Sequence, residues 1–560
     1  MLEGPNLYYP RPAIKLTIDA SGWMRTSQER VRTLSERLGA SGIVSAGLPG
    51  SEQRRRAVAR IAARLTRAVA VGSGVRTLAV RGRPGPAPNL VVVAFPWRRR
   101  VAAEALAAET TWALEALLRR APSRVITEAA GRLATTEPGP EPTVQDPSMP
   151  VIQVTGTNGK TTTVRLLAHL VRCAGLTVAY SSTDGVYRDD GILVEPGDYS
   201  GFAGAAMVLA QEPDVGVLET ARGGLLLRGC GVRHNDVAVV TNVSEDHLGL
   251  HGIDTLDQLA EVKAVITRIT RPEGWVVLNA DDPRVLAMRR HARGLPWLFS
   301  SHPEHPAFRE VLRDGGRAIS IQDGRMTWFE GHEAHPLVAT MDVPMTLAGI
   351  SGTNTLNAMA ATAAALAIGL PTEAVVRGLK TFVQDPDRNP GRANLFALDG
   401  RVVMIDYAHN EAGMIGLTEA LRGLRTGNSE VWLAICTAGD RTDAILHAFG
   451  FQAAVGSDHL AITELPRYLR GRSREDIMQR LREGAHDAGV QEVPCYADEL
   501  EALRGMTEQA RRGDVVGVTA LGMRTEIFAW LEEAGARRLG PADVRRLVRR
   551  ARASRAEDRS

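Results

Sequence analysis

The chain has 560 residues, which is too long for a single hydrophobic core and predicts about two to four domains. Hydrophobic residues make up 44% and charged residues 23% of the chain, and no apolar run reaches the roughly 20 residues of a bilayer span, so a membrane protein is excluded. The net charge of +3 provides no global attraction for nucleic acid, and we expect no such partner. Four scattered cysteines without a CxxC pair, and a start without a signal-peptide pattern, favour a cytoplasmic protein.

The first 150 residues predict a small domain followed by a linker. Residues 1–135 mix short apolar runs with arginine-studded helical patterns, which predicts a small α/β domain. Residues 136–150, TEPGPEPTVQDPSMP, contain five prolines. Neither a regular helix nor a central strand tolerates this density of proline, so we predict a linker there.

From Val151 onward the pattern changes to apolar strand, glycine turn, long helix and apolar strand. This alternation predicts an α/β fold, and we expect residues 151–386 to form a doubly wound parallel sheet with ligands at the carboxyl ends of its strands. A second α/β series over residues 387–543 predicts a third, Rossmann-like domain. The remaining residues, 544–560, are rich in arginine, and we expect a disordered basic tail.

A phosphate-binding loop follows the first strand of the central domain. The strand VIQVT leads into a glycine-containing turn and a helix, where backbone N–H groups can surround an anion and Lys160 can reach β and γ phosphate oxygens. The common pattern would place a glycine at position 154, but Val154 stands there and the glycine is Gly156, so this is a shorter variant. We predict an ATP site that includes Gly156, Thr157, Asn158, Gly159, Lys160, Thr161 and Thr162.

Two further strand ends carry candidate ligands for Mg²⁺. Glu219 ends the strand in DVGVLET, and His247 follows the next strand in NVSEDHLGLHG. Taken alone, a glutamate is more often a salt-bridge partner and a histidine is more often structural. Because both follow strands that face the phosphate loop, we predict a magnesium site shared with Thr161.

The segment GTNGKTTT resembles the ATP loop of the Mur ligase superfamily, the ADP-forming amide ligases that include muramyl amino-acid ligases, folylpolyglutamate synthetases and the Mur-like half of cyanophycin synthetase. PGRAN and IDYAHNEAG resemble the opening of the Mur ligase C-terminal domain. SSTDGVY, GDYSG, ETARGG, DHLGLHGIDTL and TAGDRTD look most like the cyanophycin synthetase branch, and the start of the chain resembles its small N-terminal domain more weakly. The resemblance implies a Mur ligase central domain at 151–386 and a Mur ligase C-terminal domain at 387–543.

Lysine is rare in this chain, since only four of its 67 basic residues are lysines. One of them, Lys263, follows His247 by 16 residues. In Mur ligases a lysine at similar spacing is carbamylated and becomes an anionic metal ligand, so the resemblance implies that Lys263 is a carbamylated, metal-binding and catalytic residue. A guanidinium could not take this role.

The resemblance also assigns nucleotide contacts outside the loop. Asn279 in VVLNADDP and Asn357 in the alanine-rich helix resemble adenosine-facing positions, and an amide can both donate to and accept from an adenine edge. Arg392 in PGRAN is expected at the γ-phosphate, and Asp406 in IDYAH at the ribose or the domain hinge. The implied catalytic set is Lys160, Glu219, His247, Lys263 and Arg392.

These features together favour an ATP- and Mg²⁺-dependent ligase that joins a carboxylate to an amine through an acyl phosphate, acting on an amino acid or short peptide. Cyanophycin synthetase has an ATP-grasp domain that the linker at 136–150 leaves no room for, so a second half-reaction would need a separate partner. The alternatives are a folylpolyglutamate-like or cell-wall-precursor ligase, and an inactive nucleotide-binding partner of another ligase. The sequence leaves homo-oligomer formation open.

Overall fold

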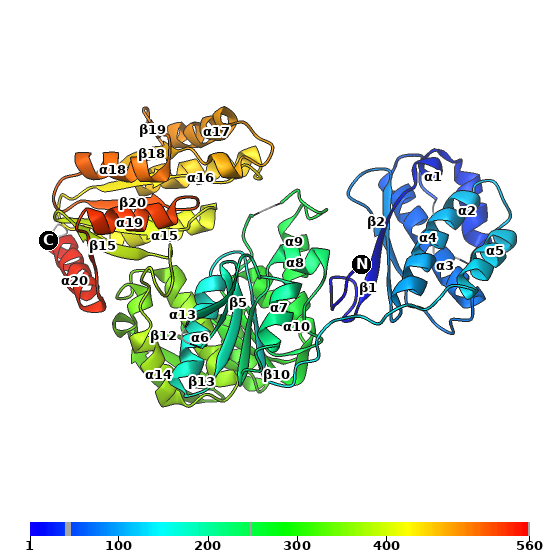
Figure 1. The fold of residues 1–560 in the computed structure, drawn as a ribbon, viewed down its shortest axis with the longest axis horizontal. Coiled ribbons are helices and arrows are strands. Elements are labelled where there is room, and N and C mark those ends of the chain that lie inside the picture. Colours follow the sequence, from blue (N-terminus) through cyan, green and yellow to red (C-terminus); the bar gives the residue numbers. More distant parts are fainter. Residues whose placement is uncertain (40–45, 190, 247, 558–560) are drawn as a thin grey trace.

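The structure is a computed structural model that describes residues 1–39, 46–189, 191–246 and 248–557. Three α/β domains, each with its own sheet, follow one another along the chain (Figure 1). The α/β class and the three-domain arrangement predicted from the sequence are confirmed. Within the described residues, no helix is both long enough and apolar enough to cross a lipid bilayer.

The N-terminal domain is a three-stranded sheet in the order β1-β3-β2 with helices packed on one face. The other face is covered by the first residues of the chain, where Tyr8 and Tyr9 pack on Val92 and Ala94 of the central strand. Its elements are β1 (Ala13–Asp19), α1 (Ser21–Arg25), α2 (Gln28–Arg37), α3 (Glu52–Gly72), β2 (Arg81–Pro84), β3 (Leu90–Pro96), α4 (Arg100–Ala116) and α5 (Pro122–Ala134).

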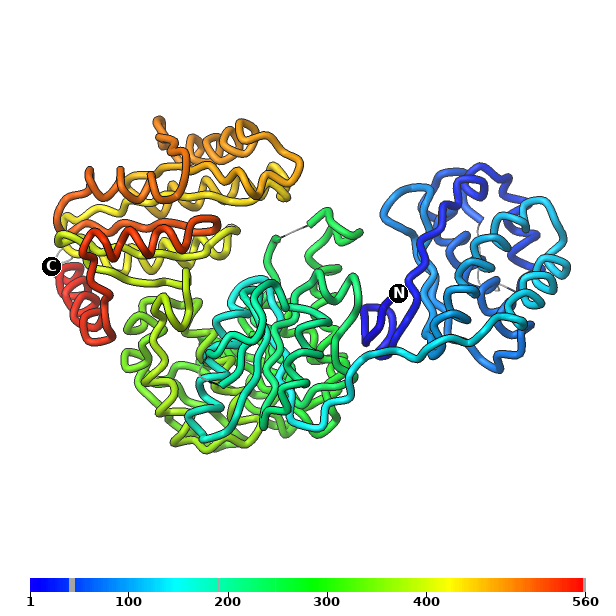
Figure 2. Tube along the Cα trace, viewed as in Figure 1, coloured from blue at the N-terminus to red at the C-terminus, as the bar shows by residue number. Residues whose placement is uncertain are grey.

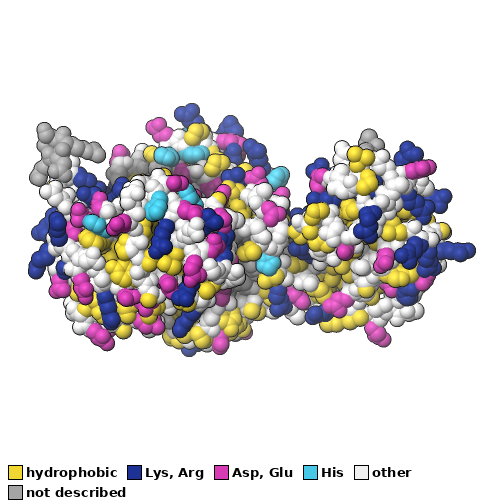
Figure 3. Space-filling view, turned by 90° about the horizontal axis from the view of Figure 1, so that it is seen from above, with side chains coloured by type: hydrophobic (Ala, Val, Ile, Leu, Met, Phe, Trp, Pro, Cys, Tyr) yellow, Lys and Arg dark blue, Asp and Glu magenta, His cyan; other side chains and the backbone are white. Residues whose placement is uncertain are grey.

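Two extended segments connect this domain to the next. The proline-rich stretch contains no helix, and Gln145 forms a single bridge with Val232 (Figure 2). The chain start lies beside the same part of the middle domain, where the N–H of Glu3 donates to the carbonyl of Arg228 at 2.8 Å. Figure 3 shows the N-terminal domain as a lobe joined to the rest by a narrow waist, with basic and acidic side chains interspersed over this face.

The middle domain is built on an 11-stranded sheet in the order β14-β13-β12-β11-β10-β9-β4-β8-β5-β6-β7. Its elements are β4 (Val151–Thr155), α6 (Lys160–Cys173), β5 (Val178–Ser182), β6 (Gly185–Arg188), β7 (Ile192–Pro196), α7 (Phe202–Leu209), β8 (Val215–Glu219), α8 (Arg222–Leu227), β9 (Asn235–Val240), α9 (Leu256–Lys263), α10 (Val265–Arg268), β10 (Thr270–Asn279), α11 (Pro283–Ala287), β11 (Leu295–Phe299), α12 (Pro306–Arg313), β12 (Arg317–Gln322), β13 (Arg325–Glu330), β14 (Glu333–Ala339), α13 (Gly352–Ala367) and α14 (Thr372–Thr381).

The centre of this sheet is parallel and doubly covered. Strands β5, β8, β4, β9, β10, β11 and β12 pair in parallel, and antiparallel hairpins close both edges. One face packs on α6, α13 and α14 and the other on α7 to α12, so successive residues of β4, such as Val151 and Ile152, belong to separate cores. Since the parallel strands all end at one edge, β4, β8 and β9 deliver their next residues to the same place.

The C-terminal domain has a seven-stranded sheet in the order β19-β18-β17-β20-β16-β15-β21. Helices cover both faces, with α15, α16, α17 and α20 on one side and α18 and α19 on the other. Its elements are β15 (Asn394–Leu398), β16 (Arg401–Asp406), α15 (Glu411–Leu424), β17 (Val431–Ile435), α16 (Asp443–Gly456), β18 (His459–Thr463), α17 (Arg474–Asp487), β19 (Cys495–Tyr496), α18 (Glu499–Gln509), β20 (Val515–Thr519), α19 (Arg524–Glu533), β21 (Arg537–Arg538) and α20 (Pro541–Glu557).

The expectation of a disordered basic tail at 544–560 is wrong for the described part of it. Helix α20 continues to Glu557, and it buries Val544, Val548 and Ala551. These residues follow one another at spacings of four and three, which places them on one face of a helix, and they join the core formed with α15. Arg552 and Arg555 donate to the carbonyls of Ala348 and Gly423 beside this stripe, so a sequence that looks polar and basic still supplies a packed face.

Candidate active site

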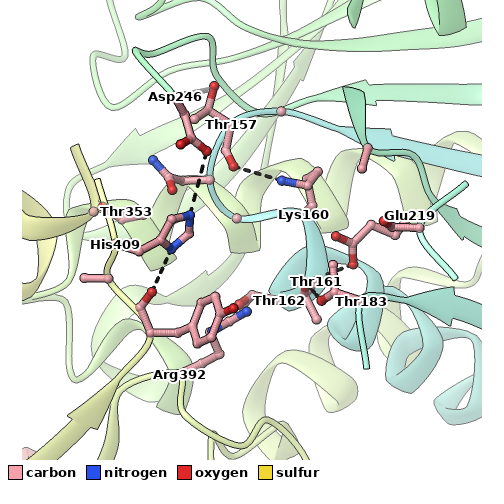
Figure 4. A pocket seen from close by; sticks show the side chains of 18 of the residues that line it. Thr157, Lys160, Thr161, Thr162, Thr183, Glu219, Asp246, Thr353, Arg392 and His409 are labelled. Atoms are coloured by element: carbon pink, nitrogen blue, oxygen red, sulfur yellow. Dashed lines mark hydrogen bonds and ion pairs between the residues drawn. The ribbon is translucent and has the colours of Figure 1, made fainter. Parts of the chain in front are cut away.

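A cavity of about 580 Å³ lies between the middle and C-terminal domains. Its walls come from the turn between β4 and α6, the ends of β8 and β16, helices α8, α9 and α13, and the loop before α15. Figure 4 shows side chains from both domains converging on this space. Residues separated by more than two hundred positions in the sequence therefore meet here.

The turn after β4 has the backbone geometry of an anion-binding loop. Gly156 and Gly159 adopt φ values of 155° and 84°, which residues with a Cβ rarely adopt. A Cβ at Gly156 would lie 1.8 Å from Thr241 Oγ1, and one at Gly159 would lie 2.2 Å from Asn357 Oδ1. Both glycines are therefore required by conformation and by space. Helix α6 begins immediately after Gly159, so its free N–H groups and the positive end of its dipole face the cavity.

Two side chains of this helix start carry the polar chemistry of the loop. The Lys160 ammonium donates to the carbonyl of Thr157 at 2.8 Å, within the loop itself (Figure 4). The Thr161 hydroxyl donates to Glu219 Oε2 at 2.9 Å. Asn158 is held by hydrogen bonds to Asn242, whose Oδ1 accepts from the Asn158 N–H at 2.9 Å. The loop is thus preorganised, with a lysine that can exchange a backbone carbonyl for a phosphate oxygen.

Glu219 is a buried carboxylate with one uncommitted oxygen. It is 1% exposed, and no described group forms a hydrogen bond with its Oε1. Burial raises the pKa of this carboxyl above its ordinary value, while Lys160, the Thr161 hydroxyl and Arg392 act in the opposite direction. A buried carboxylate oxygen without a partner is costly, and a cation beside it would remove that cost. Glu219 and Thr161 therefore fit a hard divalent cation, which prefers oxygen ligands.

Lys263 ends α9 and faces the same cavity. Its side chain is buried at 3% exposure. Burial, reinforced by the charge of Lys160, lowers the pKa of this ammonium well below its ordinary value, against the pull of Asp246 and Asp282. The environment thus favours the neutral amine, which is the nucleophilic form of a lysine.

The C-terminal domain contributes a cationic wall. The Arg392 guanidinium stacks over the Tyr407 ring at 4.1 Å and lines the cavity. Asp406 accepts backbone N–H bonds from Ala393 and Ala408, both at 2.8 Å. Burial raises the pKa of Asp406 despite Arg392 and these N–H groups. Asp406 thereby fixes the turn that presents Arg392.

Polar contacts span the two domains across the cavity. The side-chain amides of Asn158 and Asn410 exchange hydrogen bonds at 3.0 Å. Arg441, which is 6% exposed, pairs with Asp246 at 3.0 Å, and His409 Nε2 lies 3.8 Å from the same carboxylate (Figure 4). These contacts hold the second wall against the phosphate loop.

Comparison with known proteins identifies the family of both domains that form the cavity. Residues 154–365 match the Mur ligase middle domain, and residues 391–522 match the Mur ligase glutamate ligase domain. The UDP-N-acetylmuramyl-tripeptide synthetase of Deinococcus radiodurans is 30% identical over 69% of this chain and 77% of its own length. The chain belongs to the Mur ligase family. The cyanophycin synthetases of Geminocystis herdmanii and Synechocystis sp. are 37% and 38% identical, each over 66% of this Mur ligase chain.

The chain spans about two fifths of the length of those cyanophycin synthetases, since the matches cover 42% of each. Solved structures agree on the fold. E. coli FolC in complex with DHPP and ADP superimposes with a TM-score of 0.53 at 21% identity, covering 69% of this chain and 90% of FolC. A pseudomurein peptide ligase type C from Methanothermus fervidus gives a TM-score of 0.50 at 18% identity, with 69% and 80% coverage.

The structure brings most of the predicted site residues of this Mur ligase into one cavity, namely Gly156, Thr157, Asn158, Gly159, Lys160, Thr161, Thr162, Glu219, Lys263, Asn357, Arg392 and Asp406. Asn279 does not line it: its amide donates to the carbonyl of Thr241 at 2.8 Å, and its Oδ1 accepts from the Asp281 N–H. Asn279 therefore shapes the turn after β10 and is not part of the lining of this cavity. His247 lies outside the described residues.

Several cavity residues were not singled out from the sequence. Thr183 follows β5, Asp198 follows β7, and Arg222 begins α8 just after β8. Thr183 and Arg222 lie in SSTDGVY and ETARGG, where Thr183 comes directly after β5 and Arg222 three residues after the end of β8. The rule that selected Glu219, a polar residue at a strand end beside the phosphate loop, would have found them too. Among the described residues, no group of three His, Cys, Asp or Glu side chains is arranged to hold a metal.

Proposed function

We propose that this Mur ligase is an ATP-dependent, ADP-forming ligase that joins the carboxylate of an amino acid or short peptide to an amine. The observation that carries the proposal is the convergence of a phosphate loop, an uncommitted buried carboxylate oxygen and a half-buried arginine, Arg392, on one cavity. Phosphoryl transfer needs positioning and neutralisation of charge more than covalent help from the protein, and these are the groups that supply it.

The proposed reaction has two steps. A carboxylate oxygen of the first substrate attacks the γ-phosphorus of ATP, the bond to the β–γ bridging oxygen breaks, and ADP leaves. The amine of the second substrate then attacks the acyl carbon, phosphate leaves with the former carboxylate oxygen, and the nitrogen loses a proton. Lys160 and Arg392 stabilise negative charge on the transferred phosphoryl group from opposite sides of the cavity.

Magnesium fits the oxygen groups on the middle-domain side. The Thr161 hydroxyl and Glu219 would hold it, and when bound it would neutralise charge on phosphate oxygens. We propose that Lys263 joins this set as a carbamate, which forms when its neutral amine adds to carbon dioxide and releases a proton. The lowered pKa of Lys263 supports this because it increases the fraction of the neutral amine, which is the form that adds to carbon dioxide. His247 remains a predicted ligand.

Closure of the C-terminal domain would exclude water, which would otherwise hydrolyse an acyl phosphate. The contacts Asn158–Asn410 and Asp246–Arg441 support this role because they join the two domains at the cavity edge. The charged residues beyond the phosphate loop, which include Asp198, Arg222 and Asp440, suit a zwitterionic substrate such as an amino acid.

The relatives support two substrate classes. The similarity to cyanophycin synthetases supports aspartyl or arginine chemistry, and the similarity to muramyl ligases supports a peptide precursor of the cell wall. The connection between α5 and β4 spans only residues 135–150, so no ATP-grasp domain lies between the first two domains. We propose that this chain carries out one amide-forming reaction and that any second one belongs to a separate ATP-grasp protein.

The test is ADP release by the purified chain with ATP, Mg²⁺ and pairs drawn from a panel of amino acids and dipeptides. We expect turnover that requires both a carboxylate and an amine substrate. A heavy-oxygen label in the substrate carboxyl group should appear in the released phosphate, as the acyl phosphate requires. Nucleotide binding without turnover for any pair would instead support an inactive partner of another ligase, and label retained wholly in the amide product would refute the acyl phosphate.

A further inference from the structure

A second cavity, of about 760 Å³, lies between the N-terminal and middle domains. One wall is the chain start around Tyr8 and Tyr9 together with strand β2, and the other is the α9–α10 region of the middle domain. This cleft shares no lining residue with the nucleotide cavity. It is therefore a separate site, which the proposed ligase reaction does not use.

The two walls are held together by backbone contacts. The N–H groups of Glu3 and Gly4 donate to the carbonyl of Arg228, and the N–H of Cys230 donates to the carbonyl of Pro5 at 2.7 Å. A Cβ at Gly4 would lie 1.8 Å from the carbonyl oxygen of Cys230, so the close approach itself requires glycine. The cleft is thus part of a packed junction between the two domains.

Arginines dominate the polar lining of the cleft, and two of them are held in place by aromatic rings. The Arg81 guanidinium lies over the Tyr9 ring at 4.9 Å, and that of Arg83 lies over the Tyr8 ring at 4.7 Å. Arg83 also donates to the Tyr8 hydroxyl at 2.7 Å. The rings are fixed in turn, since the Tyr9 hydroxyl donates to the carbonyl of Ala79 at 2.9 Å. Ordered guanidinium groups lose less conformational freedom when they bind a ligand.

The three arginines outnumber the carboxylates that line the cleft, where Glu261 is the one acidic residue among the described lining residues. Arg268 on α10 faces Arg81 and Arg83 from the middle domain, and within the described part of the chain none of the three forms an ion pair. Glu261 lines the cleft as well, but it acts on Arg268 from beyond ion-pair distance. Burial lowers the pKa of Arg268, the charge of Glu261 raises it and that of Arg81 lowers it, while burial and Arg83 lower the pKa of nearby Lys15. The cations therefore repel one another, and an anion between them would relieve that repulsion.

We propose that the cleft binds a small oligophosphate, with Arg81 and Arg83 on one side and Arg268 on the other. Guanidinium groups bind phosphate oxygens in pairs of parallel hydrogen bonds. A short chain of phosphates carries several negative charges in a small volume, which matches the three arginines that line the cleft. The ligand is either an inorganic oligophosphate or the phosphate chain of a second nucleotide.

The cleft and the nucleotide cavity share one structural wall. Glu261, Val265 and Arg268 face the cleft, while Leu259 and Lys263 of the same α9–α10 segment face the nucleotide cavity. A bound oligophosphate would therefore restrain the segment that carries Lys263. Backbone amides of residues 256–268 should exchange more slowly with deuterium when the cleft is filled.

Calorimetric titration of inorganic triphosphate into the full chain, with the nucleotide cavity saturated by AMPPNP and Mg²⁺, tests the proposal. We expect binding that weakens about tenfold or more in Arg81→Gln/Arg83→Gln, because two charge-assisted contacts are lost. The matched control, Arg76→Gln/Arg119→Gln, removes the same charge from exposed arginines of the same domain and should bind within about twofold of the parent. Arg268→Gln removes a contact that the middle domain makes with the ligand. Weaker binding in this variant would show that both domains hold the ligand.

The two sources of the ligand are separated by stoichiometry. Two nucleotides per chain at saturation, of which one is lost in Arg81→Gln/Arg83→Gln, would identify a second nucleotide, whereas one nucleotide plus one triphosphate would identify an inorganic oligophosphate. Triphosphate binding that is absent from a parent chain that binds only one AMPPNP, or that is equal in the parent, Arg81→Gln/Arg83→Gln and Arg268→Gln, would overturn the proposal. Citrate binding as tightly as triphosphate would overturn the assignment to phosphate.

Discussion

The two walls of the nucleotide cavity are built in different ways. The middle-domain wall includes a run of consecutive residues, 156–162, whose backbone adopts its shape through two glycines and a helix start. The C-terminal wall is made of separate side chains, Arg392 and His409 among them, that reach the cavity from different turns. The first wall is complete within one domain, and the second depends on how two domains meet. We therefore expect changes in the first wall to abolish the chemistry and changes in the second to weaken it.

Lys160→Ala should have the largest effect. Removing the ammonium leaves the transferred phosphoryl group without its main cation in the middle domain, so the turnover rate should fall by at least roughly 10², or about 3 kcal/mol of barrier. The rate of ADP release measures this loss of turnover. Lys380→Ala is the matched control, because Lys380 is an exposed lysine of α14 far from the cavity in sequence, and its turnover should stay within about twofold of the parent. Near-normal turnover in Lys160→Ala would refute the assignment of the phosphate loop.

Substitutions of Lys263 test whether its side chain acts as a cation or as a carbamate. Lys263→Ala should lower turnover roughly 10-fold to 100-fold by removing a metal ligand, and a small carboxylic acid added to the buffer should restore part of it. Lys263→Arg retains the positive charge but cannot form a carbamate, so its turnover should be as low as that of Lys263→Ala. Carbon NMR after incubation with labelled bicarbonate should show a carbamate signal in the parent and none in Lys263→Ala. Full activity in Lys263→Arg would contradict the proposed role.

The raised pKa of Glu219 predicts that Mg²⁺ binding depends on pH. Since burial raises its pKa, the carboxyl takes up a proton at a higher pH than an exposed glutamate does, and the protonated form cannot bind a cation. Affinity for Mg²⁺ in the presence of AMPPNP should therefore fall as the pH is lowered, through a range above the ordinary pKa of glutamate. Glu219→Gln should bind Mg²⁺ about tenfold more weakly at neutral pH and lose this part of the pH dependence. An unchanged pH profile in Glu219→Gln would show that another group is responsible.

Asn410 tests the contact between the two walls and should give the smallest effect. Asn410→Ser retains a side-chain oxygen that can cap α15, a role Asn410 plays by accepting from the Gly413 N–H at 2.9 Å, but serine cannot exchange two hydrogen bonds with Asn158. The KM for ATP should rise about three- to tenfold, or about 1 kcal/mol, with little change in thermal stability. A large loss of stability would mean that the residue supports the fold of its own domain instead.

The difference between the two walls of the cavity also explains which features could be predicted from the sequence. The phosphate loop and Glu219 could be predicted because each lies at a strand end that local pattern identifies, whereas Lys263 was assigned through the family resemblance and the rarity of lysine in this chain. The pairing of Arg441 with Asp246, and of Asn158 with Asn410, could not, because it depends on the relative placement of two domains. Asn279 was assigned to the nucleotide by resemblance, yet a polar residue after a strand serves equally well to fix a turn. The fold of α20 was missed because its apolar stripe is short and its arginines dominate the composition.

The central claim is that ATP binds with Mg²⁺ where the middle and C-terminal domains meet. Calorimetric titration of AMPPNP into the full chain, with and without Mg²⁺, tests it most directly. We predict one nucleotide per chain at this cavity, tighter binding with Mg²⁺, and a marked loss of affinity in Lys160→Ala but not in Lys380→Ala. An absence of binding heat in the parent chain, or equal affinity in parent and Lys160→Ala, would contradict the claim.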